Sequence, residues 1–591
     1  AVPGGTARVA LPPGATLNYI SPYVPQAGAA NEDNAQGFQM LLYRPLYTFG
    51  DNGPSVAVNY PLSVANAPAY SNGGKTVTIT MKGWKWSDGE SVNASDVVFW
   101  LNMMRAEPRD YYGYGPSLLP DNLASYRAAG PSTVVLNVKS AVSSTWFTYN
   151  QLAEITPMPA AWDVTSPGAR AGSGGCATDT AADRWARCAA VYDFMSGQAK
   201  RTKSYASNPL WGVVDGPWKL SSFSTARSGP VASFVPNSAY SGGQKPRLAK
   251  FTYYAYPGGA AEYEALKAGR LDVGYVPYLH LSPVSGGQVL PSANPLGSGY
   301  TLAANDAFGI QYLAMNFNNP RVGPAFRQLY VRQALQETVD QEGMVRAVNR
   351  GYGYPTSGGV PSQPSNQWAP AIQNANGGQG PYPFSVANAA SLLRGHGWKE
   401  VGGVLTCQAP GRSTTECGPG VAGGTRLALT VDYAAGGANF RSEAALLTSD
   451  MAQAGIKLSL VPRPFDAIRG EVAPCMPAQA RCAWQILSLG GRNFDGPGFE
   501  PSGESLFATG ASSNAGSYSD PEEDRLINLT HRSDSLTVFQ QYATYTADRL
   551  PFIWLPDFST VQAVRGTLAG VAFSPLSTRL PEYWYFTKRP A

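Results

Sequence analysis

The chain has 591 residues, which is too long for a single hydrophobic core, so we expect two or three compact units. Apolar residues make up 43% of the sequence, as in globular proteins, while charged residues make up only 14%. The net charge of +4, spread without Lys/Arg runs, gives no reason to expect a nucleic-acid partner. No apolar stretch approaches the roughly 18 residues of a membrane span.

The cysteines suggest the compartment. Local spacing favours three disulfides, and closing each short loop stabilises a fold by roughly 2–3 kcal/mol in the chain-entropy model. Such bonds imply an oxidising environment. The alternative is zinc binding, which is weaker because no CxxC occurs and the three histidines lie far from the cysteines. The expected pairs are Cys176 with Cys188, Cys407 with Cys417, and Cys475 with Cys482.

Two strand–helix–strand units are predicted from periodicity. In each unit a glycine, Gly269 or Gly455, follows the helix at the position that favours a left-handed residue. Crossovers of this kind build parallel sheets, and we assign the two units to separate lobes because they lie far apart in the sequence. The first covers 251–256, 260–268 and 271–276, and the second covers 426–432, 442–454 and 456–461.

Further helices follow from capping residues and apolar spacing. Asn93 precedes one as its cap, with Asp96 three residues on, and Ser385 precedes another. Trp84 and Trp86 alternate and are expected in the core rather than in a sugar-stacking site. The predicted helices cover 94–104, 331–348, 386–394 and 538–550.

Several segments, in order along the chain, resemble one family. The most specific is Gly83-Trp84-Lys85-Trp86-Ser87-Asp88-Gly89, followed by Asp96-Val97-Val98-Phe99. Together the segments resemble the extracellular solute-binding proteins, family 5, that serve dipeptide and oligopeptide ABC importers. The matching segments are 43–47, 83–99, 215–220, 237–246, 312–316, 331–335 and 518–524.

This resemblance implies an α/β, two-lobed periplasmic-binding-protein-like fold of type II, in its three-domain variant, with hinge strands between the lobes. The implied domain I has segments 1–45, 206–305 and 565–591; domain II, 46–205, is inserted in lobe I; and lobe II, or domain III, covers 306–564.

The resemblance also places a ligand site. Asp495 falls on the family's Gly-x-x-x-Asp stretch and is expected to pair with a peptide's α-ammonium, with Gly490, Gly491, Arg492 and Phe494 beside it. The alternative is that Asp495 pairs with Arg492 or caps a turn. The chain departs from the family here, because Gly-Pro-Gly-Phe separates Asp495 from Glu500, where relatives have a shorter gap. This insertion would change the direction in which the Asp495 side chain points.

Other residues are candidates for the first-lobe side of the site. Arg44 is expected to bind a ligand carboxylate by donating hydrogen bonds to it, although a plain surface turn would also explain its segment. Two aromatic residues in the Gly/Pro-rich loop 351–383 are expected to line the cleft. The full set is Tyr43, Arg44, Pro45, Leu46, Tyr354 and Trp368.

The function expected from this resemblance is capture of a peptide or peptide-like ligand and its delivery to an ABC importer permease. Alternatives are an oligosaccharide or metal-chelate carrier of the same fold, and a secreted glycan or peptide hydrolase. Since nucleophile elbows and zinc-protease motifs are lacking, we expect no enzyme activity, cofactor or bound metal. We expect an exported, extracellular or cell-envelope monomer with no nucleic-acid partner, touching the membrane only through an N-terminal lipid anchor.

Overall fold

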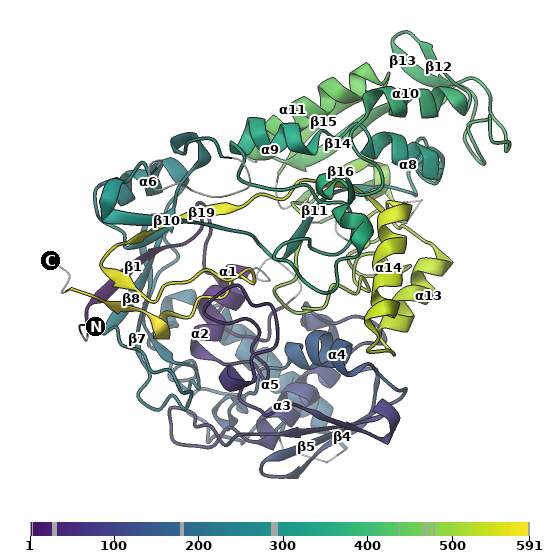
Figure 1. Ribbon diagram of the computed structural model, residues 1–591. Helices are drawn as coiled ribbons and strands as arrows, with labels where there is room; N and C mark the ends of the chain where they lie inside the picture. Colours follow the sequence, from purple (N-terminus) through teal and green to yellow (C-terminus); the bar gives the residue numbers. More distant parts are fainter. Residues whose placement is uncertain are drawn as a thin grey trace.

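The structure is a computed structural model with two lobes, which Figure 1 shows one above the other. The N-terminal half of the chain builds the lower lobe, the green segments build the upper one, and the C-terminal segment contributes to both. The structure describes residues 2, 4–25, 32–177, 182–284, 294–435, 438–464, 467–468, 470–471, 473–476 and 479–588.

Seven strands form the main sheet of the first lobe, in the order β10-β19-β9-β1-β8-β7-β6. The first strand, β1, lies parallel to both β8 and β9, and α6 (Gly259–Lys267) connects these two. The first predicted crossover is therefore confirmed. The strands are β1 Thr6–Ala10, β6 Trp218–Phe223, β7 Gly229–Pro236, β8 Lys250–Ala255, β9 Val273–Tyr275, β10 Tyr300–Asn305 and β19 Thr560–Arg565.

A four-stranded antiparallel sheet, β2-β3-β5-β4, forms the far end of the first lobe. Beside it, α3 begins at the predicted cap, where Asn93 and Asp96 form a reciprocal capping box. The indole N–H of Trp86 donates to Asp96 at 2.9 Å, and both Trp84 and Trp86 are buried, which confirms their place in the core. The elements are β2 Ala69–Ser71, β3 Thr76–Thr80, β4 Leu123–Gly130, β5 Thr133–Val138, α3 Ala94–Ala106, α4 Ser144–Trp146 and α5 Arg184–Ala199.

The second lobe has a sheet in the order β15-β14-β16-β11-β17, with β18 also paired to β11. Parallel β14 and β15 flank the crossover helix α11, as predicted. The strands are β11 Gly309–Met315, β14 Ala428–Ala434, β15 Lys457–Arg463, β16 Ile486–Ser488, β17 Arg492–Asn493 and β18 Phe552–Leu555. The helices include α8 Leu329–Gln336, α9 Gln341–Asn349, α10 Val386–Gly395, α11 Ala438–Gln453, α13 Pro521–Thr530 and α14 Leu536–Arg549.

The single helix predicted over 331–348 is wrong. The structure has two helices, α8 and α9, because Asp340 is not helical and its side chain caps α9 by accepting from the Gly343 amide at 2.8 Å. The helices predicted from Ser385 and over 538–550 are confirmed as α10 and α14.

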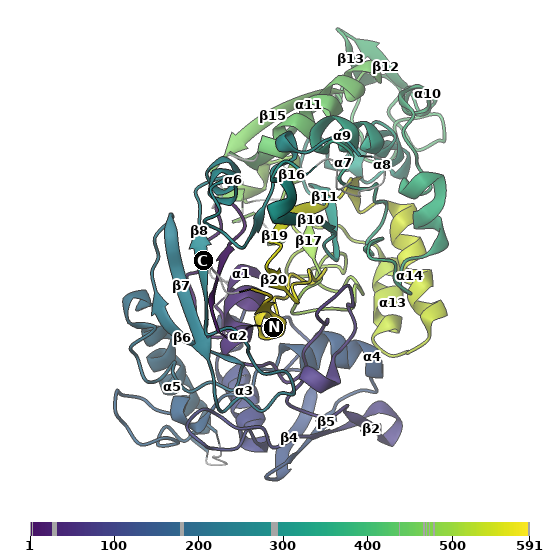
Figure 2. The same cartoon turned by 60° about the vertical axis from the view of Figure 1, so that its left-hand side comes forward.

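Two chain crossings connect the lobes. Antiparallel β10 and β19 lie in the first sheet, while β11 and β18, which continue them, pair in the second. Figure 2 shows this group at the centre of the molecule. Ser559 donates to Asp306, which joins the two crossings directly. Strand β19 ends at Arg565 and belongs to the first sheet. Residues 560–564, which we expected in lobe II, therefore lie in the sheet of the first lobe. The division of the chain into five domain segments stays a prediction.

All three expected disulfides are present: Cys176–Cys188, Cys407–Cys417 and Cys475–Cys482. Within the described part of the chain, no helix has both the length and the apolar character that a membrane crossing needs.

Candidate ligand-binding site

The segment from Gly490 to Glu500 runs between the lobes and is bordered by three cavities of about 780, 260 and 80 Å³. Side chains of its strand alternate between two of them: Arg492 and Phe494 line the largest, and Asn493 lines the second. The largest cavity takes its walls from 105–154 of the first lobe and 492–532 of the second. Its volume lies within the range of about 300–1,000 Å³ that small-ligand sites occupy.

The backbone of this segment is fixed against β11. Ile310 pairs with Arg492, and the Phe494 amide donates to the Phe308 carbonyl at 2.8 Å. Gly491 has φ +81°, and a Cβ there would lie 2.5 Å from the Ile310 carbonyl oxygen, so only glycine fits. Gly490 has φ +82° but open space around it.

Asp495, the predicted acceptor of an α-ammonium, lies inside this segment and is only 7% exposed. Its carbonyl accepts from Gln36 of the first lobe. Asp495 lines none of the three cavities, but it is close to the largest. Burial, and then the charge of Asp495, raise the pKa of Tyr112, a residue of that cavity's wall.

The structure does not bring Arg44 to a cavity. Its guanidinium is fully buried and pairs with Glu582, while its amide donates to Asp215 at 2.8 Å. A ligand carboxylate has no route to this group in the observed conformation. Tyr43 and Pro45 line the 80 Å³ cavity, whereas Leu46 is buried in the core.

The two aromatic candidates, Tyr354 and Trp368, contact residues around the cleft but do not line it. Tyr354 donates to Asp557 at 3.3 Å, and Asp557 lines the 260 Å³ cavity. Trp368 is buried and meets Tyr149 of the first lobe edge-on, with ring centroids 5.8 Å apart. Neither aromatic residue lines any of the three cavities.

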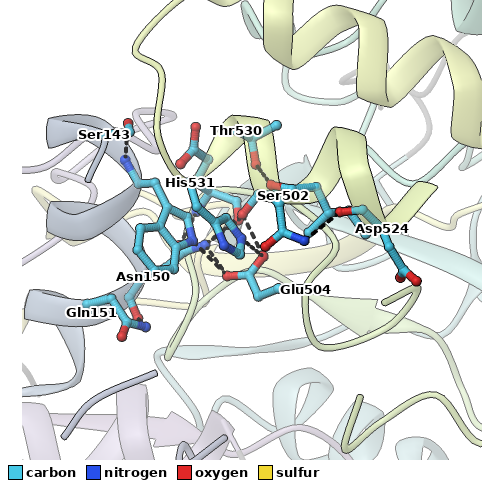
Figure 3. Close-up of polar contacts among 12 residues, drawn as sticks. Ser143, Asn150, Gln151, Ser502, Glu504, Asp524, Thr530 and His531 are labelled. Atoms are coloured by element: carbon cyan, nitrogen blue, oxygen red, sulfur yellow. Dashed lines mark hydrogen bonds and ion pairs between the residues drawn. The ribbon is translucent and has the colours of Figure 1, made fainter. Parts of the chain in front are cut away.

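Sequence reasoning missed a polar network, in the wall of the largest cavity, that joins the lobes. Figure 3 shows the contacts of this network. Glu504 accepts hydrogen bonds from Asn150 at 2.8 Å, Trp146 at 3.1 Å and Ser502 at 2.6 Å. Nε2 of His531 lies 3.7 Å from its carboxylate. Burial alone would raise the pKa of Glu504, but the imidazole and the donors lower it to about 2. This carboxylate is therefore ionised.

The side-chain amide of Asn150 makes a second set of hydrogen bonds between the lobes, with the backbone of Glu500. Its Nδ2 donates to the Glu500 carbonyl at 3.0 Å, and its Oδ1 accepts from the Glu500 amide at 2.8 Å. Nearby, Phe49 and Phe499 stack with ring centroids 3.9 Å apart. These contacts show that the lobes are closed on each other beside the cavity.

Two further carboxyls of the cavity wall, Glu154 and Glu500, were also missed. Each is 6% exposed, and burial, followed by the charge of Glu504, raises the pKa of both well above the ordinary value. Oε2 of each has no hydrogen-bond partner among the described residues. The only sequence signal was an acid within an apolar stretch, as in Leu152-Ala153-Glu154-Ile155.

The fold is that of the two-lobed periplasmic-binding proteins. AppA, the oligopeptide-binding protein from Bacillus subtilis solved with a nonapeptide, is similar with a TM-score of 0.69, 18% identity and 99% of each chain covered. The dipeptide-binding protein of a Pseudoalteromonas species, solved with Met-Leu, has a TM-score of 0.66 and 17% identity, covering 99% of this chain and 100% of its own. NikA from Brucella suis, solved with Fe(III)-EDTA, has a TM-score of 0.67 and 17% identity, covering 99% of this chain and 100% of its own.

The sequence itself matches the family model described as bacterial extracellular solute-binding proteins, family 5 middle, over residues 60–483. The chain therefore belongs to this family of solute-binding proteins, which confirms the resemblance drawn from its motifs. A search of curated proteins finds no match.

Proposed function

We propose that this protein captures a peptide in the 780 Å³ cavity between its lobes and delivers it to the permease of an ABC importer. The observation that carries this proposal is the shape of the site: both lobes contribute walls to one cavity, and two strand crossings connect them. A ligand that contacts both lobes favours the closed state and shifts an open–closed equilibrium toward it. The peptides bound by AppA and the Pseudoalteromonas protein support this ligand class.

The peptide backbone has a place to bind. Among the described residues, β17 ends the strand order of the second sheet, so one of its edges lies outside the β11 pairing. An extended peptide that adds to such an edge gains main-chain hydrogen bonds whatever its sequence. Asp495 lies two residues after the end of β17, and we propose that it receives the α-ammonium when the lobes open and close around the ligand.

The protein acts, in this proposal, as a carrier without chemistry of its own. The three disulfides support an oxidising, extracellular or cell-envelope location. A monomer with an N-terminal lipid anchor completes the proposal. The second candidate is a metal-chelate carrier, which the similarity to NikA with Fe(III)-EDTA favours.

Calorimetric titration distinguishes these ligand classes. We expect heat of binding, and a raised melting temperature, with Met-Leu or with alanine oligopeptides of two to six residues, because a ligand that binds only the folded state stabilises it by mass action. Fe(III)-EDTA and maltooligosaccharides serve as comparison ligands. Binding of either comparison ligand, with no response to any peptide, would overturn the peptide proposal and leave the carrier role.

A further inference from the structure

The wall of the largest cavity carries three acids drawn from both lobes. Glu154 comes from the first lobe, four residues after Asn150, while Glu500 and Glu504 come from the second. Asn150 of the first lobe holds the other two acids in place, since its side chain bonds both the Glu500 backbone and the Glu504 carboxylate. The negative charge of Glu504 acts on Glu154 and on Glu500 alike, so the three groups form one electrostatic cluster.

Two of these acids each have one buried carboxyl oxygen without a hydrogen-bond partner among the described residues. Glu504 is satisfied by Asn150, Trp146 and Ser502, but Oε2 of Glu154 and Oε2 of Glu500 have no hydrogen-bond partner among the residues that the structure describes. Buried polar groups are normally paired, so each such exception needs an explanation. Here both exceptions belong to the wall of the same cavity, where an occupant can supply the missing partner.

We propose that this cavity binds a cationic group of the ligand, the ammonium or guanidinium of a basic side chain, between Glu154 of the first lobe and Glu500 and Glu504 of the second. This inference rests on the proposed function and adds a preference to it. The expected ligand is a peptide with a lysine or arginine residue in addition to its α-ammonium.

An organic cation fits this cluster better than a metal ion. Within the described part of the chain, no three His, Cys, Asp or Glu side chains converge closely enough to hold a metal. An ammonium with three donors, or a guanidinium with five, can span carboxylates that stand further apart. The acids are also nearly excluded from solvent, where a charge-assisted hydrogen bond is strong.

The position of the acids on opposite lobes couples the cation to closure. Closing the lobes brings Glu154 toward Glu500 and Glu504, and burial beside the charge of Glu504 disfavours the ionised form of Glu154 and Glu500. A cation between the three groups favours their ionised form instead, so binding of the cation stabilises the closed state. A peptide that lacks the cation leaves the carboxyls unpaired, and sites built around polar groups discriminate strongly against such analogues.

Lysine scanning tests this preference. The ligands are tetra-alanine, tetra-alanine with one lysine at each position in turn, and the same peptides with Nε-acetyllysine, which keeps the chain and removes the charge. For at least one position, we expect the lysine peptide to bind at least tenfold more tightly than its acetyllysine counterpart in calorimetric titration. Glu154→Gln and Glu500→Gln should each reduce this ratio severalfold.

Glu262→Gln is the matched control. Glu262 is also buried, also has an Oε2 without a partner among the described residues, and lies outside the cavity, so its substitution should leave the ratio unchanged. Circular dichroism confirms that each variant is folded. A melting-temperature series with 1,5-diaminopentane measures the cation site without any peptide backbone; we expect a shift that Glu154→Gln and Glu500→Gln abolish.

The outcomes separate the two proposals. If alanine peptides bind and every lysine peptide equals its acetylated form, the cation site is overturned and the peptide carrier stands. If no peptide binds but the diamine response depends on Glu154 and Glu500, the cation site stands and the peptide proposal fails. If neither peptide nor diamine produces a response, both fail.

Discussion

The carboxylate of Asp534 in the second lobe accepts a hydrogen bond from the Thr145 amide of the first lobe at 3.0 Å. The hydroxyls of Ser143 and Ser144 donate to the same carboxylate at 2.6 and 2.9 Å. Burial raises the pKa of Asp534, but these donors outweigh burial and the pKa is lowered. The ionised aspartate therefore holds the start of α4 and links the lobes close to Val142 and Trp146, which line the cavity.

Asp534→Asn should favour the open state. Hydrogen bonds to a charged group contribute about 1.5–3 kcal/mol, so the loss of charge should change the open–closed ratio by about tenfold or more. Small-angle X-ray scattering of the free protein should show a larger radius of gyration. Asp524→Asn is the matched control, because Asp524 bonds Thr509 within the second lobe. An unchanged radius in Asp534→Asn would show that the contact does not hold the lobes.

Arg44→Met should lower stability strongly. The pair of Arg44 and Glu582 is fully buried, and removal of one partner of such a pair costs about 3–5 kcal/mol because the other charge stays buried. The melting temperature should fall by several degrees. Arg525→Met, which breaks an exposed pair with Glu522, should change stability by no more than about 0.5 kcal/mol. Lost ligand binding at unchanged melting temperature would instead support the role first expected for Arg44.

Sequence reasoning was most successful where the cause is local. The crossover units, the Asn93 capping box and the disulfides depend on residues close in the chain, and each is present. The burial of Arg44 was not predicted because its partner Glu582 lies 538 residues away. The acids of the cavity were missed for the same reason: only the contact between lobes places Glu154 beside Glu504, and no short motif records it.

Gly491→Ala should damage the site more than Gly490→Ala. Both residues have φ near +80°, where a side chain costs roughly 1–2 kcal/mol. At Gly491 the new Cβ would also lie 2.5 Å from the Ile310 carbonyl and push β17 away from β11. We therefore expect a larger loss of melting temperature and of ligand affinity at Gly491. Equal losses in the two variants would mean that the β11–β17 contact does not shape the site.

Asp495→Asn tests the proposed α-ammonium contact. The substitution keeps the shape of the side chain and removes its charge, so affinity for a free tetra-alanine should fall by about tenfold, as expected for the loss of a charge-assisted hydrogen bond. Affinity for N-acetylated tetra-alanine, already weak, should not change. Calorimetric titration of both peptides against both proteins gives the comparison. If the variant loses equal affinity for the two peptides, Asp495 has a structural role only.

Stability should fall as the pH rises from about 4 to 8. Burial is the main cause that raises the pKa of Asp96 and Asp215 to about 7 and of Glu262 to about 8. The folded state therefore keeps protons that the unfolded state releases near pH 4, and the free energy of unfolding decreases between these pKa values. We expect a higher melting temperature at pH 5 than at pH 8, and a smaller difference in Asp96→Asn, whose amide does not titrate. A melting temperature that rises across this interval would contradict protonation of these buried acids.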